Sequence, residues 1–153
     1  MGANLGDRLD TLRAAVDALG ALGVTVEAVS KIYETAPREV VDQPAFLNAA
    51  CRIRTDLDPP ALLALVKSIE RDLGRVTGPR YGPRAIDIDI LLWDGGAWHD
   101  QHLEVPHPRL SERRFALVPA LDLDPDLTLA GEAMADVEAR LDRGDQPVSP
   151  YLP

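Results

Sequence analysis

The stretch that decides the fold runs from Arg80 to Leu92 and reads RYGPRAIDIDILL. Its alternation of isoleucine and aspartate predicts a β-strand, because side chains two residues apart on a strand project to the same side. The isoleucine face belongs in a hydrophobic core, and the opposite face then carries two neighbouring carboxylates. The first face holds Ile86, Ile88, Ile90 and Leu92, and the second holds Asp87, Asp89 and Leu91.

Two carboxylates on one strand face repel each other unless a positive charge lies between them. Arg80 and Arg84 are near enough in sequence to form salt bridges with Asp87 and Asp89. A divalent cation such as Mg²⁺ is the alternative partner, since it prefers oxygen ligands. The strand pattern alone leaves both explanations open.

The composition limits the class of protein. A chain of 153 residues is long enough for one domain with a core and too short to expect two. The net charge of −9 argues against general nucleic-acid binding, which needs clustered lysines and arginines. No apolar stretch reaches the length of a membrane span, and the N-terminus lacks the pattern of a signal peptide. A single cysteine, Cys51, cannot form an internal disulfide, so we expect a cytoplasmic protein without a membrane partner.

Hydrophobic periodicity predicts an alternation of helices and strands. Asp7 and Asp58 are predicted to cap two helices that end at Gly20 and Gly74, and Ser111 to cap a third. Residues 1–141 are expected to form one domain, and residues 142–153 an irregular C-terminal tail. The predicted strands are 24–33, 46–54 and 86–92, and the predicted helices are 7–20, 58–74, 111–118 and one within 131–141.

This order predicts a layered α+β domain, in which helices cover one face of a mainly antiparallel sheet and the other face is free. Alternation along 46–54 puts Leu47, Ala49, Cys51 and Ile53 on the core side. The free face would then gather the side chains of Phe46, Asn48, Asp87 and Asp89. An amide, a ring and two carboxylates on one open face indicate a binding site.

Several motifs resemble those of the 6-hydroxymethyl-7,8-dihydropterin pyrophosphokinases. RYGPRAIDIDIL is similar to the family's signature, and further motifs follow in the family's order. The resemblance implies a ferredoxin-like fold. It also implies transfer of an intact pyrophosphoryl group from ATP to the hydroxymethyl group of the reduced pterin, with release of AMP, in folate biosynthesis. The further motifs are GANLGDR, YETAP, DQPAFLNAA, IERDLGR, VPHPRLSERRF and PALDLDPDL.

The resemblance implies roles for individual residues. It identifies ATP and the pterin as partners, with other folate-pathway enzymes as further candidates. Asp87 and Asp89 match the pair that holds two Mg²⁺ ions against the triphosphate. The catalytic residues it implies are Arg75, Arg84, Asp87 and Asp89. The nucleotide-binding residues are Glu70, Ile90, His107 and Arg113. The pterin-binding residues are Gly2, Thr35, Ala36, Pro37, Phe46, Asn48 and Phe115.

Each assignment competes with an ordinary structural explanation. Phe46 and Phe115 could be core residues, His107 a turn residue, and Glu70, four residues before Gly74, would normally face solvent. Asparagine, in contrast, is disfavoured on a strand, which favours a specific role for Asn48. Two other functions stay open: a non-catalytic ligand-binding module of the same fold, and another Mg²⁺-dependent phosphotransferase or hydrolase that uses an Asp-x-Asp pair.

The chain also departs from the family's pattern. Ala3, Ala36 and Tyr81 stand where the family usually has serine, proline and tryptophan, and the loop from Arg75 to Arg84 is one residue shorter than a common form. In the family an apolar strand leads into the first motif, whereas here only Met1 precedes Gly2. We therefore expect the first strand to be truncated and the active protein to begin upstream.

Overall fold

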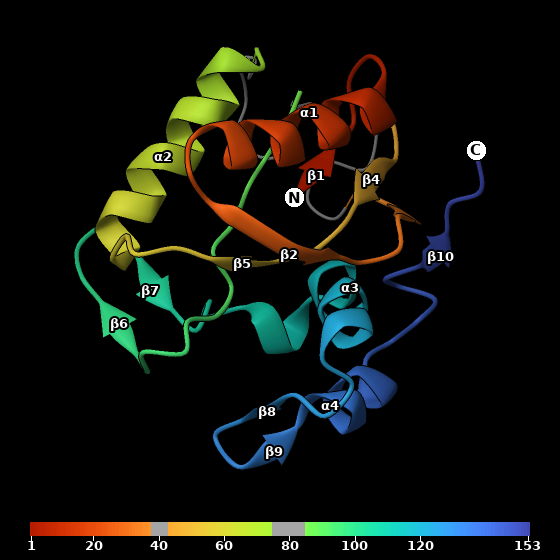
Figure 1. The fold of residues 1–153 in the computed structure, drawn as a ribbon. Helices are drawn as coiled ribbons and strands as arrows, with labels where there is room; N and C mark the ends of the chain where they lie inside the picture. The colour runs from red at the N-terminus through yellow and green to blue at the C-terminus, as the bar shows by residue number, and fades with distance from the viewer. Residues whose placement is uncertain (38–42, 75–84) are drawn as a thin grey trace.

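The computed structural model of the protein describes residues 1–37, 43–74 and 85–153. These residues form an α+β fold (Figure 1). None of the helices within them is long and apolar enough to cross a membrane. The helices are α1 (Arg8–Ala21), α2 (Pro59–Asp72), the 3₁₀ turn η1 (Leu110–Glu112), α3 (Arg114–Leu123) and α4 (Met134–Arg140). The strands are β1 (Gly2–Ala3), β2 (Thr25–Val29), β3 (Tyr33–Thr35), β4 (Phe46–Asn48), β5 (Cys51–Arg54), β6 (Trp98–His99), β7 (Glu104–Val105), β8 (Thr128–Leu129), β9 (Glu132–Ala133) and β10 (Val148–Pro150).

Two of the three predicted helix caps are confirmed. The Asp7 carboxylate accepts the backbone N–H of Asp10 at 3.0 Å, and that of Asp58 accepts the N–H of Ala61 at 3.0 Å. Each bond satisfies an N–H group that the first helical turn leaves without an intrahelical partner. The third cap is wrong, because Ser111 lies in η1 and α3 begins only at Arg114.

The Asp58 cap gives a stability prediction. Asp58→Ala should lower the free energy of unfolding by about 1 kcal/mol, because the N–H of Ala61 loses its acceptor. Chemical denaturation measures this change. Asp56→Ala is the control, since Asp56 is exposed and precedes the cap without capping the helix. Equal destabilisation by both variants would contradict the cap.

Antiparallel strands form two neighbouring sheets beside the helices α1 and α3. One sheet has the order β1-β4-β3-β10, and the other pairs β2 with β5. Gly2 lies opposite Asn48, and Phe46 lies opposite Thr35. The register therefore brings residues from three separate segments of the chain onto adjacent strands.

Helices cover both sides of these strands rather than one, and Figure 1 shows α1 and α3 on opposite sides of β2 and β5. On the side of α3, the Arg52 guanidinium donates to the carbonyl oxygen of Leu123 at 3.3 Å, and the Tyr33 hydroxyl donates to Asp122 at 2.7 Å. Burial and this second bond raise the pKa of Tyr33 to about 12, so the hydroxyl keeps its proton. The expectation of a free sheet face is wrong, because the apolar side of α3 also needs cover.

The stretch 86–90 alternates in burial as predicted, but it is not a regular strand. Ile86 and Ile88 are buried, whereas Asp89 is exposed. Within the described residues, its backbone pairing with a strand is the single bridge between Asp87 and Gly2. The next N–H, of Ile88, donates to the side chain of Glu70 at 3.0 Å instead of to a neighbouring strand. The prediction of faces is thus confirmed for residues 86–90, but it is wrong for Leu92, which is exposed, and for Leu91, which packs against the second core cluster. The prediction of a strand ladder is wrong.

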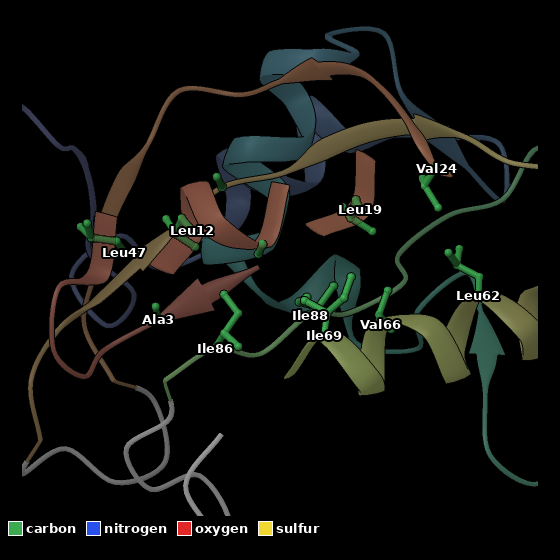
Figure 2. Close-up of a cluster of buried hydrophobic side chains, with 12 residues drawn as sticks. Ala3, Leu12, Leu19, Val24, Leu47, Leu62, Val66, Ile69, Ile86 and Ile88 are labelled. Atoms are coloured by element: carbon green, nitrogen blue, oxygen red, sulfur yellow. The ribbon is translucent and has the colours of Figure 1, made fainter. Parts of the chain in front are cut away.

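The main core lies between α1, α2 and the strands. Figure 2 shows Ile88 beside Ile69 and Val66 of α2, so the extended stretch 86–90 is held against that helix by apolar contact. A second cluster joins Leu110 and Leu117 to the last helix. The main cluster consists of Ala3, Leu12, Ala15, Leu19, Val24, Leu47, Ala49, Leu62, Val66, Ile69, Ile86 and Ile88.

The C-terminal segment is partly ordered into the sheet. The prediction that residues 142–153 are irregular is wrong for β10, which pairs antiparallel with β3. Val148 lies opposite Thr35 and Pro150 opposite Tyr33. A sheet edge presents unpaired N–H and C=O groups, and β10 satisfies those of β3. Proline is tolerated there because β10 is an outer strand.

Candidate active site

One wall of the site is built by β1, β3 and β4. Asn48 is only 7% exposed, and its side-chain amide donates to the hydroxyl oxygen of Thr35 at 2.6 Å. The amide oxygen lies against Gly2, where an added Cβ would overlap it. The missing side chain of Gly2 therefore allows a buried amide to lie directly against the backbone of β1.

Aromatic rings lie on two elements around this amide. Phe46 precedes Asn48 on β4, and Phe115 is in the first turn of α3. The Arg113 guanidinium carbon lies 5.5 Å from the centre of the Phe115 ring, which is within the range of a cation–π contact. Phe46, Asn48, Phe115 and Arg113 all line one pocket of about 1200 Å³.

The carboxylate pair lines the same pocket. Asp87 is fixed against β1 by two backbone hydrogen bonds with Gly2, of 2.9 and 2.8 Å. Asp89 follows on the same side of the extended stretch and is exposed. The described residues contain no group of three or more histidines, cysteines or acidic residues able to hold a metal alone. Two carboxylates nevertheless fit Mg²⁺, which typically takes one or two of them and completes its shell with water and substrate phosphates.

Glu70 is buried rather than solvent-facing, with 1% of its surface exposed. One carboxylate oxygen accepts the N–H of Ile88 at 3.0 Å, and the other pairs with Lys67 at 3.0 Å. Ile88 lies between the two aspartates, so this contact fixes the backbone that carries them. Its predicted role in nucleotide binding stays a prediction, and Glu70 lies outside the residues that line the pocket.

His107 is held in one orientation near the carboxylates. Its backbone N–H donates to Leu91 at 2.8 Å, and its Nδ1 accepts the N–H of Arg109 at 3.2 Å. Burial lowers the pKa of the imidazole from its ordinary value, and Arg113 and Arg109 lower it further, although Asp89 acts in the opposite direction. The lowered pKa and the N–H bond accepted by Nδ1 favour the neutral ring with its proton on Nε2.

The structure brings most of the predicted site residues to one pocket. Pro37, Glu70 and His107 are not among the residues that line it. Arg75 and Arg84 lie outside the described residues, so their predicted catalytic roles stay predictions. The predicted residues that line the pocket are Gly2, Thr35, Ala36, Phe46, Asn48, Asp87, Asp89, Ile90, Arg113 and Phe115.

Three further basic residues line the pocket without having been predicted as site residues: Arg52, Arg54 and Lys67. Arg52 shares the strand face of Asn48, and the alternation along 46–54 already contained that signal. Lys67 lies one helical turn before Glu70, a spacing that brings the two side chains together. All three add positive charge to the pocket that also holds Asp87 and Asp89.

An α+β domain with a buried amide, two rings and a carboxylate pair in one pocket has the features of an enzyme that binds a flat heterocycle and a metal-bound anion. Residues 1–125 match the family described as 7,8-dihydro-6-hydroxymethylpterin-pyrophosphokinase (HPPK). The chain belongs to this family.

Similar proteins occur both as separate enzymes and as parts of longer chains. A 2-amino-4-hydroxy-6-hydroxymethyldihydropteridine pyrophosphokinase of Methylorubrum extorquens is 45% identical over 143 residues, covering 93% of this chain and 90% of the relative. A protein of the same name from Bacillus subtilis is 47% identical over 124 residues, covering 80% and 74%. The mitochondrial folate synthesis bifunctional protein of Pisum sativum is 46% identical over 123 residues, which cover 80% of this chain but 24% of that protein.

Proposed function

We propose that the protein transfers the pyrophosphoryl group of ATP to 6-hydroxymethyl-7,8-dihydropterin, giving the pterin diphosphate and AMP in folate biosynthesis. The observation that carries the proposal is the convergence of Asn48 and the pair Asp87 and Asp89 on one pocket. The amide fits the polar edge of a pterin, and the carboxylates fit the metal that accompanies ATP. Family membership supports the same reaction.

The pterin would bind against β4 and α3. Asn48 would hydrogen-bond the polar edge of the pterin ring. Phe46 and Phe115 would contact the faces of the ring, because flat heterocycles stack favourably on aromatic side chains. Gly2 lets Asn48 take its position, and Thr35 holds the amide in one orientation. The remaining contacts that we propose for the pterin are those of Ala36 and Pro37.

ATP would lie beside the extended stretch 86–90. Asp87 and Asp89 would hold two Mg²⁺ ions, which supply charge neutralisation for the phosphate oxygens. Arg113 would pair with phosphate oxygens, and the neutral His107 can donate one hydrogen bond from Nε2. We also assign nucleotide contacts to Glu70 and Ile90, and phosphate contacts to Arg75 and Arg84.

In the transfer, the hydroxymethyl oxygen of the pterin forms a bond to the β-phosphorus of ATP. The bond from that phosphorus to the bridging α-phosphate oxygen breaks, AMP leaves with the electron pair of that bond, and the hydroxyl proton passes to solvent. The chain's contribution is to align the two substrates and to place positive groups beside the phosphates, which lowers the barrier by positioning and electrostatic stabilisation.

Some broader expectations belong to the same proposal. We assign residues 1–141, together with the strand β10 that pairs with β3, to one pyrophosphokinase domain with ferredoxin-like layering, and we place the protein in the cytoplasm. Association with other folate-pathway enzymes is supported by relatives that are named as bifunctional folate synthesis proteins.

The test is incubation of the protein with ATP, Mg²⁺ and 6-hydroxymethyl-7,8-dihydropterin, with nucleotide products separated by chromatography. Pterin-dependent release of AMP is expected. Release of ADP would indicate a different phosphotransferase or a hydrolase, and the absence of nucleotide turnover with retained pterin binding would indicate a non-catalytic binding module.

The pterin wall gives a separate prediction. Asn48→Ala should weaken pterin binding about tenfold, because it removes a buried hydrogen-bonding group worth about 1–3 kcal/mol. Phe46→Ala should also weaken it, through loss of ring contact. ATP affinity should change little in both variants. Calorimetric titration with each ligand measures this, and equal weakening of both ligands would contradict the assignment.

A further inference from the structure

Helix α3 begins without a cap from its own neighbours. Its N-cap residue, Arg113, makes no side-chain capping bond. The N–H of Arg114 donates instead to the side-chain oxygen of Gln146 at 2.9 Å, across 32 residues of sequence. A residue of the C-terminal segment thus supplies the acceptor that a helix start normally finds locally.

Gln146 makes two more bonds to the same short stretch. Its backbone oxygen accepts from the Arg114 guanidinium at 2.6 Å, and its side-chain amide donates to the carbonyl of Glu112 at 3.0 Å. Arg114 is only 6% exposed, and its Nε donates to Glu138 at 2.9 Å. The charge of the guanidinium is therefore compensated inside the protein, which a buried charge requires.

The same C-terminal segment also holds the opposite wall of the pocket. Val148 pairs with Thr35, whose hydroxyl accepts the amide of Asn48. Just beyond, the N–H of Tyr151 donates to Ile32 at 2.9 Å. Residues 146–151 therefore join the strand that supports Asn48 to the helix start that carries Arg113 and Phe115.

We infer that residues 146–151 set the separation between the two walls of the pterin pocket, which are the strands around Asn48 and the start of α3. Gln146 is the positioning residue of this segment. Gln146 is not among the residues that line the pocket, and it acts through Arg113 and Phe115, which flank its bonding partner Arg114. The inference rests on the proposed pyrophosphokinase function. It goes beyond the family match, which ends at residue 125 and so includes neither Gln146 nor Glu138.

The test is Gln146→Leu, which keeps the side-chain size but removes both side-chain hydrogen bonds. The KM for the pterin should rise about fivefold to tenfold, the range expected for lost hydrogen bonds, while kcat stays within about threefold of the wild-type value. Hydrogen exchange at the Arg114 amide should accelerate. Arg140→Gln is the matched control, because it breaks an exposed ion pair with Glu132 in the same part of the fold. That control should leave both KM and the Arg114 exchange rate unchanged.

A merely structural role for Gln146 would lower the melting temperature and the active fraction, but it would leave the pterin KM of the folded protein within twofold of wild type. That result would overturn the inference. If Gln146→Leu does not fold, Gln146→Asn is tested in its place. This variant keeps the backbone bond to Arg114 and shortens the side chain by one methylene, which weakens the side-chain hydrogen bonds. The KM of this variant for the pterin should also rise, and an unchanged KM would again overturn the inference. A wild-type protein without pterin-dependent AMP release would instead refute the proposed function, and the inference with it.

Discussion

Asp87→Asn and Asp89→Asn should each lower the rate of AMP release by about 100- to 1,000-fold at saturating substrates, the usual cost of removing one preorganised electrostatic group. Asparagine keeps the size of the side chain but loses the charge that attracts Mg²⁺. The fold should persist, because Asp87 is fixed through its backbone bonds to Gly2 and Asp89 is exposed. Chromatographic assay of AMP over a range of Mg²⁺ concentrations measures the effect.

Asp17→Asn is the control for this pair, since it makes the same chemical change at an exposed position on α1. It should retain wild-type turnover. Circular dichroism and thermal melts should show that all three variants are folded. If either pocket variant kept more than about a tenth of the wild-type rate at saturating Mg²⁺, the metal assignment would be refuted.

The carboxylate pair also shows what the sequence could predict and what it could not. Alternation along 86–90 correctly separated the buried isoleucines from the exposed Asp89, because burial follows the two-residue period of an extended chain. The hydrogen bonding was not predictable in this way. The partner of the Ile88 N–H is Glu70, 18 residues away on α2, and no local pattern marks a helical glutamate as the acceptor.

The same distinction applies to the helices. The starts of α1 and α2 were predictable because their caps, Asp7 and Asp58, lie next to them in the chain. The start of α3 was not, because its acceptor comes from Gln146. The packing of α3 on the Asn48 side of the strands was missed for the same reason, since the contacts that place it are made with distant segments. Motif resemblance nevertheless placed Phe115 in the site without that geometry.

Gly2→Ala should weaken pterin binding strongly, with the Kd for the pterin rising about 10- to 100-fold. The added Cβ would overlap the side-chain oxygen of Asn48, so the two cannot keep their present positions. Asn48 is buried and bonded to Thr35, and turning it away breaks that bond as well as the proposed contact with the pterin edge. Calorimetric titration with the pterin measures the loss.

Gly20→Ala is the matched control for this change. Gly20 lies in α1, and a Cβ added there meets no atom within 4 Å. That variant should bind the pterin normally and should unfold with a free energy about 0.5–1 kcal/mol higher, because alanine restricts the unfolded chain and favours the helix. Gly2→Ala should instead be less stable by about 1–3 kcal/mol, the cost of leaving a buried polar group unsatisfied. Unchanged pterin binding in Gly2→Ala would mean that the amide of Asn48 does not hydrogen-bond the polar edge of the pterin from its present position.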